Sequence, residues 1–292
     1  WLRHDSVMIN KNEWYRFSQN KGGHAIDFMK EFYGLSFAEA VKELLGEEGV
    51  GETNRRTAKE DAGRQKVCPI PLPGLELPER NESCEIARKY LIEQRKLSEW
   101  LIDQMIAKGD IYESKNYHNV VFVGMDADGK PRYANQRGIG SDFIGDANGS
   151  DKHYSFGIPA TAASDTLHLF ESAVDLLSYG TLQKLDGKDW RSENLLSLAG
   201  VYKPRAKIEE SSLPAALVRY LAEHPHIRHV VLRLDNDATG RIAAETIKAL
   251  LPRKYAVTVD IQPPPQGKDY NDCLCMRLGL PITKRGERSK ER

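Results

Sequence analysis

Apolar residues in this chain recur with two spacings, one typical of strands and one typical of helices. Two short apolar runs, Thr166–Phe170 and Val230–Leu234, have the length of buried strands, and a third run at Tyr255–Ile261 is rich in β-branched residues. Between these runs the pattern predicts crossover helices, near 173–184, 213–224 and 240–251. Strands that alternate with helices predict an α/β unit built on a parallel sheet with flanking helices.

Carboxylate side chains follow two of these predicted strands. Asp235 comes directly after the run that ends at Leu234, and Asp237 comes two positions later, so both side chains point the same way if extended geometry continues. Glu171 ends the earlier strand, and Asp175 follows four positions later. Carboxylates this close repel one another unless a cation is bound, and ligands of open α/β sheets bind at the carboxyl ends of the strands. We therefore predict a cation site at this edge.

A third acidic segment follows the last predicted strand. After three consecutive prolines the chain reads Gly-Lys-Asp-Tyr-Asn-Asp, which places Lys268, Asp269 and Asp272 in one loop. Each acidic segment alone also has a structural interpretation, because Asp-x-Asp before Gly is typical of a turn with a helix N-cap and Gly-Lys-Asp is common in loops. The occurrence of all three in one βαβ region favours a functional site.

Composition divides the chain into five segments. Residues 1–46 hold a short β-rich piece and a helix, and residues 47–80 form a charged and then proline-containing linker. Residues 81–160 are predicted to be a small helical and β subdomain, and residues 161–280 form the α/β unit. The basic tail at 281–292 has few apolar residues and is expected to be disordered.

The first and third segments have their own predicted elements. The first contains a helix at Phe37–Leu45. The third contains helices at Glu82–Gln94 and Ser98–Ala107, the latter N-capped by Ser98, and an antiparallel β segment at Ile111–Ala134 that turns at Asp126–Gly129.

The composition fits a cytoplasmic globular protein without a membrane segment. Hydrophobic residues make up 40% of the chain and charged residues 29%, and no apolar run approaches the about 18 residues of a membrane span. The four cysteines form no C-x-x-C pair and suit a reducing cytosol. The chain begins at Trp1 rather than Met, so we expect the natural N-terminus to lie upstream.

The formal net charge is +0, so any nucleic acid has to be bound by local basic patches rather than by the charge of the whole protein. The candidate patches contain Lys130, Arg132, Arg137, Lys152 and His153, and Lys203, Arg205 and Lys207.

The acidic segments resemble the motifs of the Toprim domain, the Rossmann-like catalytic fold of bacterial-type primases, type IA and type II topoisomerases and some nucleases. The resemblance rests on the order and spacing of three motifs, at 171–175, 235–240 and 267–272. Upstream, Tyr90–Ser98 resembles the helical start of the primase catalytic core, and Val120–Lys130 resembles its basic β-rich subdomain. Taken together, the chain is most similar to Toprim proteins of bacterial conjugative and other mobile elements.

The resemblance implies phosphoryl or nucleotidyl transfer on DNA that depends on Mg²⁺ or Mn²⁺, and no organic cofactor. It gives Glu171, Asp235 and Asp237 catalytic roles, and it implies that Glu171 also shuttles a proton as general base or acid. The implied metal ligands are hard carboxylates that suit one or two Mg²⁺ ions, namely Glu171, Asp175, Asp235, Asp237, Asp269 and Asp272. The residues expected to neutralise phosphate charge are Arg137, Lys152 and Lys268. The implied partners are single-stranded DNA, nucleoside triphosphates and a replicative helicase or relaxase of the same element.

The chain departs from the family pattern at several positions. Trp14 to Ala40 resembles the second half of the primase zinc-binding domain, but Arg16 and Gln19 stand where that domain has cysteines. We therefore expect a degenerate N-terminal domain that folds without zinc. Within the Toprim motifs, Ser172 replaces the usual Gly and Asn271 replaces the second acid of the last motif, changes that concern primer synthesis more than metal binding.

Three functions are compatible with these motifs. The domain order favours primase-like synthesis of primers on single-stranded DNA. A Toprim nuclease or a topoisomerase-like enzyme that cleaves phosphodiesters is an alternative, although no nucleophilic Tyr is identifiable in the sequence. A non-catalytic DNA-binding scaffold is the third possibility, and the presence of Glu171 together with Asp235 and Asp237 argues against it.

Overall fold

The computed structural model describes residues 7–10, 13–16, 21–45, 74–201 and 211–280. The predicted tail at 281–292, most of the predicted linker and the basic patch at 203–207 lie outside the described residues. The chain divides into two compact units, Trp1–Cys68 and Pro69–Arg292. No helix in the described ranges is both long enough and apolar enough to cross a membrane.

The first unit is a small antiparallel sheet followed by two helices. In chain order these elements are β1 (Val7–Asn10), β2 (Glu13–Arg16), β3 (Lys21–His24), α1 (Ala25–Tyr33) and α2 (Phe37–Leu45). Trp14 is the buried centre of the unit, and its ring meets Phe28 and Phe32 edge-on at centroid distances of 5.9 and 4.9 Å. Gln19 lies outside the described residues, as does the side chain of Arg16, so zinc-free folding stays a prediction.

The second unit is built on a five-stranded sheet with the order β12-β11-β9-β10-β8. Its strands are β8 (Gly157–Ile158), β9 (Thr166–Phe170), β10 (Asn194–Ser197), β11 (His229–Arg233) and β12 (Thr258–Ile261). Strands β9 to β12 are parallel to their neighbours, and the edge strand β8 runs antiparallel to β10. The predicted parallel sheet is confirmed, and the two strands that precede acidic segments, β9 and β11, are neighbours within it.

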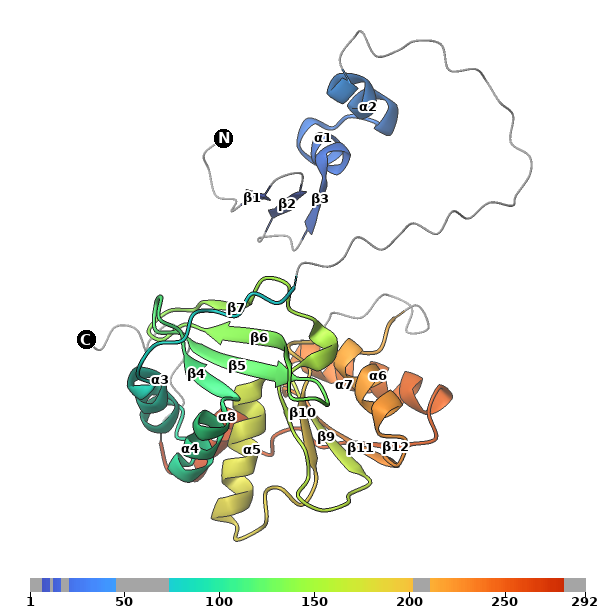
Figure 1. Cartoon of the computed structure of the whole chain (residues 1–292). Coiled ribbons are helices and arrows are strands. Elements are labelled where there is room, and N and C mark those ends of the chain that lie inside the picture. Colours follow the sequence, from blue (N-terminus) through green and yellow to red (C-terminus); the bar gives the residue numbers. More distant parts are fainter. Residues whose placement is uncertain (1–6, 11–12, 17–20, 46–73, 202–210, 281–292) are drawn as a thin grey trace. The chain divides into compact units, whose positions relative to one another are not determined.

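Helices cover both faces of this sheet (Figure 1). They are α5 (Ala173–Leu185), α6 (Ala215–Glu223), α7 (Ala238–Leu250) and α8 (Tyr270–Arg277). Successive strand residues point to opposite faces, so Leu169 joins a core with α6 and α7 whereas Phe170 joins a core with α5 and α8. The crossover helices predicted from the apolar pattern are confirmed to within a few residues.

A four-stranded antiparallel sheet with the order β4-β5-β6-β7 lies before the α/β sheet in the chain. Its strands are β4 (Ile111–Glu113), β5 (Val120–Met125), β6 (Pro131–Arg137) and β7 (Ile144–Asp146). The predicted turn between β5 and β6 is confirmed: Oδ1 of Asp126 accepts hydrogen bonds from the N–H groups of Asp128 and Lys130, and Gly129 has a φ of 75°. Residues 74–80, inside the predicted linker, run along this sheet, where Arg80 forms a β-bridge with Ser114.

The helices before this sheet differ from the single long helix predicted at Glu82–Gln94. The α-helical part, α3 (Glu85–Lys89), continues as a π-helical turn, η3 (Tyr90–Gln94), before α4 (Glu99–Lys108) begins. The wider turn lets the N–H of Arg95 reach the carbonyl of Tyr90 at 3.0 Å. Ser98 stands at the N-cap of α4 as predicted, but its side chain makes no capping hydrogen bond.

One hydrophobic core joins these helices and the antiparallel sheet to the α/β sheet. It contains Leu91, Leu101 and Phe122 from the earlier segment and Phe170 and Leu176 from the later one, each at most 1% exposed. The two segments therefore fold around shared apolar contacts.

Gly124 in β5 provides a test of how closely the parts of this unit are packed. A Cβ at this position would lie 1.6 Å from the carbonyl oxygen of Tyr154, in the short helix η4 (Lys152–Tyr154). Gly124→Ala therefore has to displace backbone, and we expect it to lower the free energy of unfolding by about 1–3 kcal/mol in urea denaturation. Gly74→Ala is the control, because a Cβ there meets no atom within 4 Å. Equal stabilities of the two variants would contradict the packing.

Candidate active site

The register of β9 and β11 brings two acidic segments to the same edge of the sheet. Phe170 pairs with Arg233, so Glu171 lies opposite Leu234 and one position from Asp235. Neighbouring strands lie about 4.8 Å apart. The backbones that carry Glu171 and Asp235 therefore leave the sheet side by side.

Asp235 and Asp237 share one cationic partner, the ammonium group of Lys268. Its Nζ lies 3.0 Å from Oδ2 of Asp235 and 3.2 Å from Oδ2 of Asp237. Asp235 is only 6% exposed, and this burial raises the pKa of its carboxyl. Burial alone would lower the pKa of Lys268, but its hydrogen bonds to both aspartates raise it. Lys268 therefore stays charged and offsets the negative charge of the pair.

Asp237 also caps a helix, so the structural interpretation of this motif holds beside the electrostatic one. Its Oδ1 accepts the N–H of Gly240 at 2.9 Å as the N-cap of α7. This hydrogen bond, followed by the contact with Lys268, lowers the pKa of the Asp237 carboxyl. The two oxygens of one carboxylate therefore do different work: one fixes the helix start and the other faces the ammonium group.

Backbone hydrogen bonds hold the loop that carries Lys268. The N–H of Lys268 donates to Oδ2 of Asp272 at 3.1 Å, and its carbonyl accepts the N–H of Asn236 at 2.6 Å. The preceding Gly267 has a φ of 77°, and a Cβ there would lie 2.5 Å from that of Asp272. The 267–272 motif is thus hydrogen-bonded directly to the 235–237 motif through Lys268 and Asn236.

Asp175, which is buried, and Asp269, which is half-buried, extend the acidic cluster. Asp175 is 6% exposed and accepts a hydrogen bond from Oγ of Ser172 at 2.5 Å. Burial, reinforced by the negative charges of Asp269 and Asp235, raises the pKa of Asp175 to about 8. Asp269 is the N-cap of α8 and accepts the N–H of Asp272 at 2.7 Å. The charges of Asp269 and Asp235 therefore act on Asp175.

Two arginines from the earlier segment lie beside this cluster. Arg137, at the end of β6, is 8% exposed, and burial together with the nearby charge of Arg95 lowers its pKa, while the charge of Asp175 acts in the opposite sense. Arg95 donates from Nε to the hydroxyl of Tyr90 at 2.7 Å and from Nη1 to Oδ1 of Asn271 at 3.3 Å. Any phosphate that contacts Arg137 has to approach the acidic residues closely.

Lys152 lies near the same edge but has a carboxylate partner of its own. Its Nζ is 3.1 Å from Oδ2 of Asp146 and 3.5 Å from the carbonyl oxygen of Ala199. The next residue, Gly200, donates its N–H to the carbonyl of Glu171 at 2.9 Å. Lys152 is therefore connected to the backbone of Glu171 through one short loop.

A buried polar network supports the strand ends just before the acids. Arg233 of β11 donates from Nε to Nδ1 of His168 at 2.8 Å and from Nη1 to the hydroxyl of Tyr270 at 2.9 Å. The other ring nitrogen of His168 bonds Glu193, and the Tyr270 hydroxyl donates to the carbonyl of Gln262 at 3.0 Å. Burial, together with the charge of Arg233, lowers the pKa of His168 to about 4, so it is neutral and can accept from Arg233.

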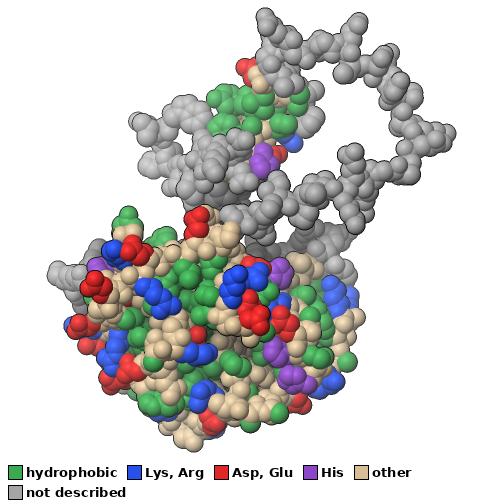
Figure 2. Space-filling view, viewed as in Figure 1, with side chains coloured by type: hydrophobic (Ala, Val, Ile, Leu, Met, Phe, Trp, Pro, Cys, Tyr) green, Lys and Arg blue, Asp and Glu red, His purple; other side chains and the backbone are tan. Residues whose placement is uncertain are grey.

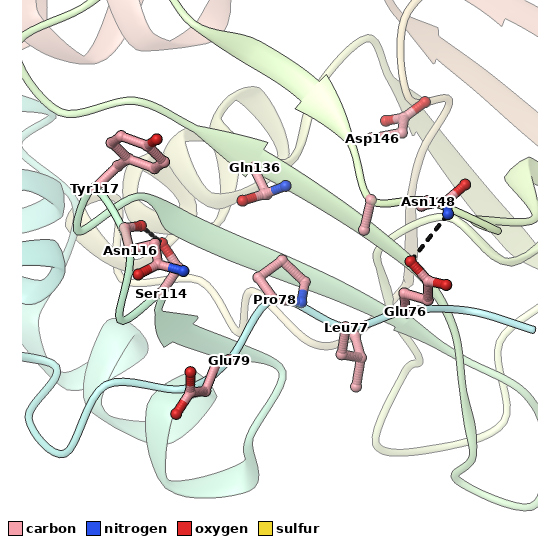
Figure 3. Close-up of a pocket in the computed structure, with 11 residues that line it drawn as sticks. Glu76, Leu77, Pro78, Glu79, Ser114, Asn116, Tyr117, Gln136, Asp146 and Asn148 are labelled. Carbon is pink, nitrogen blue, oxygen red and sulfur yellow. Dashed lines mark hydrogen bonds between the residues drawn. The ribbon is translucent and has the colours of Figure 1, made fainter. Parts of the chain in front are cut away.

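A cavity of about 370 Å³ lies between residues 76–79 and the antiparallel sheet, apart from the acidic cluster of Asp175, Asp235, Asp237 and Asp269 (Figure 3). Its lining consists of Glu76, Leu77, Pro78, Glu79, Ser114, Asn116, Tyr117, Gln136, Asp146, Ala147 and Asn148. Its three carboxylates already have partners in Asn148, Lys115 and Lys152. None of the predicted site residues lines it, so this cavity contributes nothing to the acidic site.

Positive and negative side chains are interspersed over the described residues on the face shown in Figure 2. This mixture agrees with a formal net charge of +0. Nucleic acid that binds on this face therefore meets separate basic groups rather than a continuous basic stripe.

The carboxylates of the cluster suit a hard divalent cation by their chemistry. Among the described residues, no three His, Cys, Asp or Glu side chains stand close enough together to hold a metal ion by themselves. Mg²⁺ is commonly held by one or two carboxylates, with waters and substrate phosphates as its other ligands. Asp235 and Asp237 already converge on one cationic group, and they therefore fit that mode of binding.

Sequence reasoning missed Arg95 and Asn271 as neighbours in the site. Nδ2 of Asn271 donates to the carbonyl of Arg95 at 2.7 Å and to Oγ of Ser178 at 3.0 Å. The two residues are 176 positions apart. No local pattern reports such a contact, although the replacement of an expected acid by Asn271 marked the position as unusual.

Two family models match consecutive parts of the chain. One described as "Protein of unknown function (DUF3991)" matches residues 89–162, and one described as "Toprim-like" matches residues 168–274. The uncharacterized protein pXO2-78 of Bacillus anthracis is 32% identical over 212 residues, which cover 69% of this chain and 58% of that relative. The chain thus spans little more than half the length of the relative.

Several solved structures are similar at low sequence identity. The primase fragment of the Bacteriophage T7 primase-helicase protein is 14% identical with a TM-score of 0.43, and the similarity covers 92% of this chain and 87% of that one. The RNA polymerase domain of Mycobacterium tuberculosis primase DnaG is 12% identical with a TM-score of 0.44, covering 68% of this chain and 74% of that one.

Asp175→Asn should change how the stability of the protein depends on pH. The folded pKa of Asp175 is about 8, so above about pH 4 the folded protein holds a proton that the unfolded chain has released. The contribution of this proton to the free energy of unfolding is therefore complete below about pH 4. It is lost as the pH rises toward 8, at up to about 1.4 kcal/mol per pH unit. In EDTA, calorimetry should show the melting temperature of the parent protein falling relative to that of the variant between pH 5 and 8. A constant offset between the two would contradict this.

Two substitutions of Asp237 separate its capping role from its charge. Asp237→Asn keeps an oxygen for the N–H of Gly240, so we expect the free energy of unfolding to change by less than about 0.5 kcal/mol. Asp237→Ala removes the cap as well and should cost about 1 kcal/mol. Urea denaturation in EDTA measures both values, and an Asn variant as unstable as the Ala variant would show that the charge rather than the cap stabilises this loop.

Proposed function

The chain carries a Toprim-like domain at residues 168–274, and on that premise we propose that it transfers nucleotidyl groups on DNA in a metal-dependent, primase-like reaction. The observation that carries the proposal is the position of acidic residues just after two neighbouring parallel strands. Glu171 follows β9, and Asp235 and Asp237 follow β11, where they share the charge of Lys268. Such a cluster is costly for folding and is typical of a site that binds cations and phosphates.

Asp235 and Asp237 are the proposed metal ligands, and the negative charge of Asp269 acts on the same site. A bound Mg²⁺ or Mn²⁺ ion would supply charge neutralisation for phosphate oxygens. Asp235 is buried, so its carboxylate is held in place by its surroundings, and Asp237 is oriented by its bond to Gly240. The pair is therefore positioned before any substrate arrives.

Glu171 is the proposed group that accepts a proton from the attacking 3′-hydroxyl. Its backbone leaves β9 beside that of Asp235, and its carbonyl is fixed by the N–H of Gly200. A carboxylate can act in this way if it lies within hydrogen-bond reach of the hydroxyl. Glu171→Gln should then keep the fold and remove the proton acceptor.

Single-stranded DNA is the proposed template, and nucleoside triphosphates are the proposed substrates. We propose that phosphates pass between the antiparallel sheet and the α/β sheet, near Arg137 and Lys152. Support comes from the position of Arg137 beside Asp175 and from the loop that connects Lys152 to Glu171. Because each phosphate contact releases counter-ions, affinity should fall as salt rises, with a slope that depends on the number of contacts. The proposed protein partner is a replicative helicase or relaxase of the same mobile element. The proposed location of the reaction is the cytoplasm.

Incorporation of labelled nucleotides on single-stranded DNA tests the reaction directly. With Mg²⁺ or Mn²⁺ the parent protein should extend or initiate chains, and Glu171→Gln and Asp235→Asn should each lose at least about 100-fold in rate, the usual contribution of general-base and electrostatic groups. Asp260→Asn is the matched control, because Asp260 is an exposed carboxylate on the edge strand β12 and pairs with His229, the first residue of β11.

Shortened DNA products on the same gel would assign the site to phosphodiester cleavage instead. Binding of single-stranded DNA without any metal-dependent product would assign the chain a scaffold role. Equal loss of activity in Asp260→Asn would show that the effect is a general one of charge removal.

A further inference from the structure

A lysine ammonium group lies between the two carboxylates that are the proposed metal ligands. Nζ of Lys268 is 3.0 Å from Asp235 and 3.2 Å from Asp237. Mg²⁺ binds carboxylate oxygens at about 2.0–2.1 Å. An ion bound to both of these oxygens would touch the ammonium group, and two cations in contact repel strongly. The ammonium group and a metal ion shared by these two oxygens therefore compete for the same carboxylates.

The backbone of Lys268 is fixed, whereas its side chain is free to move away. The N–H and carbonyl groups of Lys268 are bonded to Asp272 and Asn236. Its side chain is 44% exposed and consists of a flexible four-carbon stem. The charge can thus leave the aspartates by rotation of the stem while the loop stays in place.

We propose that Lys268 is a tethered counter-ion, which holds Asp235 and Asp237 together in the metal-free protein and is displaced when a divalent ion binds. Once displaced, the ammonium group remains within a side-chain length of the metal and can pair with a substrate phosphate. The inference rests on the proposed function in one respect, that these aspartates are the metal ligands. It adds an exchange of cations that a fixed phosphate-binding lysine would not show.

The exchange solves a problem of the metal-free state. Without a cation, the carboxylates of Asp235 and Asp237 would repel each other, and the charge of Asp269 acts on Asp235 in the same sense. The ammonium group removes this repulsion while the site is without metal, so the acids can stay in their binding positions. It also lowers metal affinity, because each metal ion has to displace it.

Chemical labelling of lysines tests the displacement in the parent protein. A lysine-acylating reagent is applied over a titration with Mn²⁺, binding of which is followed in parallel by electron paramagnetic resonance. Labelling of Lys268, quantified by mass spectrometry, should rise several-fold with the same midpoint as Mn²⁺ binding. Lys115, which pairs with Glu79 on the antiparallel sheet, is the internal reference and should not change.

Substitution tests the competition independently of catalysis. Lys268→Met should bind Mn²⁺ about three- to tenfold more tightly, the range of a partly exposed ion pair. Lys268→Arg should not, since guanidinium still occupies the two carboxylates. Lys115→Met removes one positive charge elsewhere and should leave affinity within about twofold. Melting curves in EDTA confirm that each variant is folded.

Three results would overturn the inference. They are unchanged Lys268 labelling while Mn²⁺ binds, weaker Mn²⁺ binding by Lys268→Met, and absence of Mn²⁺ binding to the parent protein. The first two leave the proposed function standing, because the aspartates could bind metal beside a fixed lysine. A protein that binds Mn²⁺ with exchange but incorporates no nucleotide would support the inference and contradict the proposed function.

Discussion

Repulsion between carboxylates is the constraint on which this site depends. A parallel sheet brings the carboxyl ends of its strands to one edge, and here that edge carries Glu171 and Asp235, with Asp237 two residues on. Burial strengthens the repulsion because little water is left to screen the charges. Cations from other segments offset the negative charge. Lys268 contacts Asp235 and Asp237, and the charge of Arg137 acts on the same region near Asp175.

Polar contacts beneath the acids keep the strand ends rigid against this repulsion. Arg233 connects His168 of β9 with Tyr270 of α8, and Tyr270 in turn reaches the chain after β12. The guanidinium of Arg233 also lies over the ring of Tyr179 at 4.3 Å. These contacts join β9, β11, α5 and α8 within a few residues of Asp235. A site on such a support can hold charged groups in place without a ligand.

The sequence revealed the parts of the site that depend on local patterns. The strand Thr166–Phe170 and the helix after Asp237 could be predicted because apolar spacing and capping residues act over a few positions. The contact of Arg95 with Asn271 could not, because it depends on how two distant segments fold together. The π-helical turn that places Arg95 has no sequence signal at all. Likewise, Lys268 could be predicted near phosphate, but not between two aspartates, because its long side chain has many rotamers.

The shared core has a consequence for how such a chain can be inherited. The segment matched by the DUF3991 model and the segment matched by the Toprim-like model contribute to one apolar cluster. Asn271 fastens them again, from α8 to the carbonyl of Arg95. A gene rearrangement that separated the two would expose Leu91 and Phe170 to water and leave buried amides without partners. Recombination should therefore transfer the two segments together. Breakpoints should fall outside the pair and not at the boundary between the two segments.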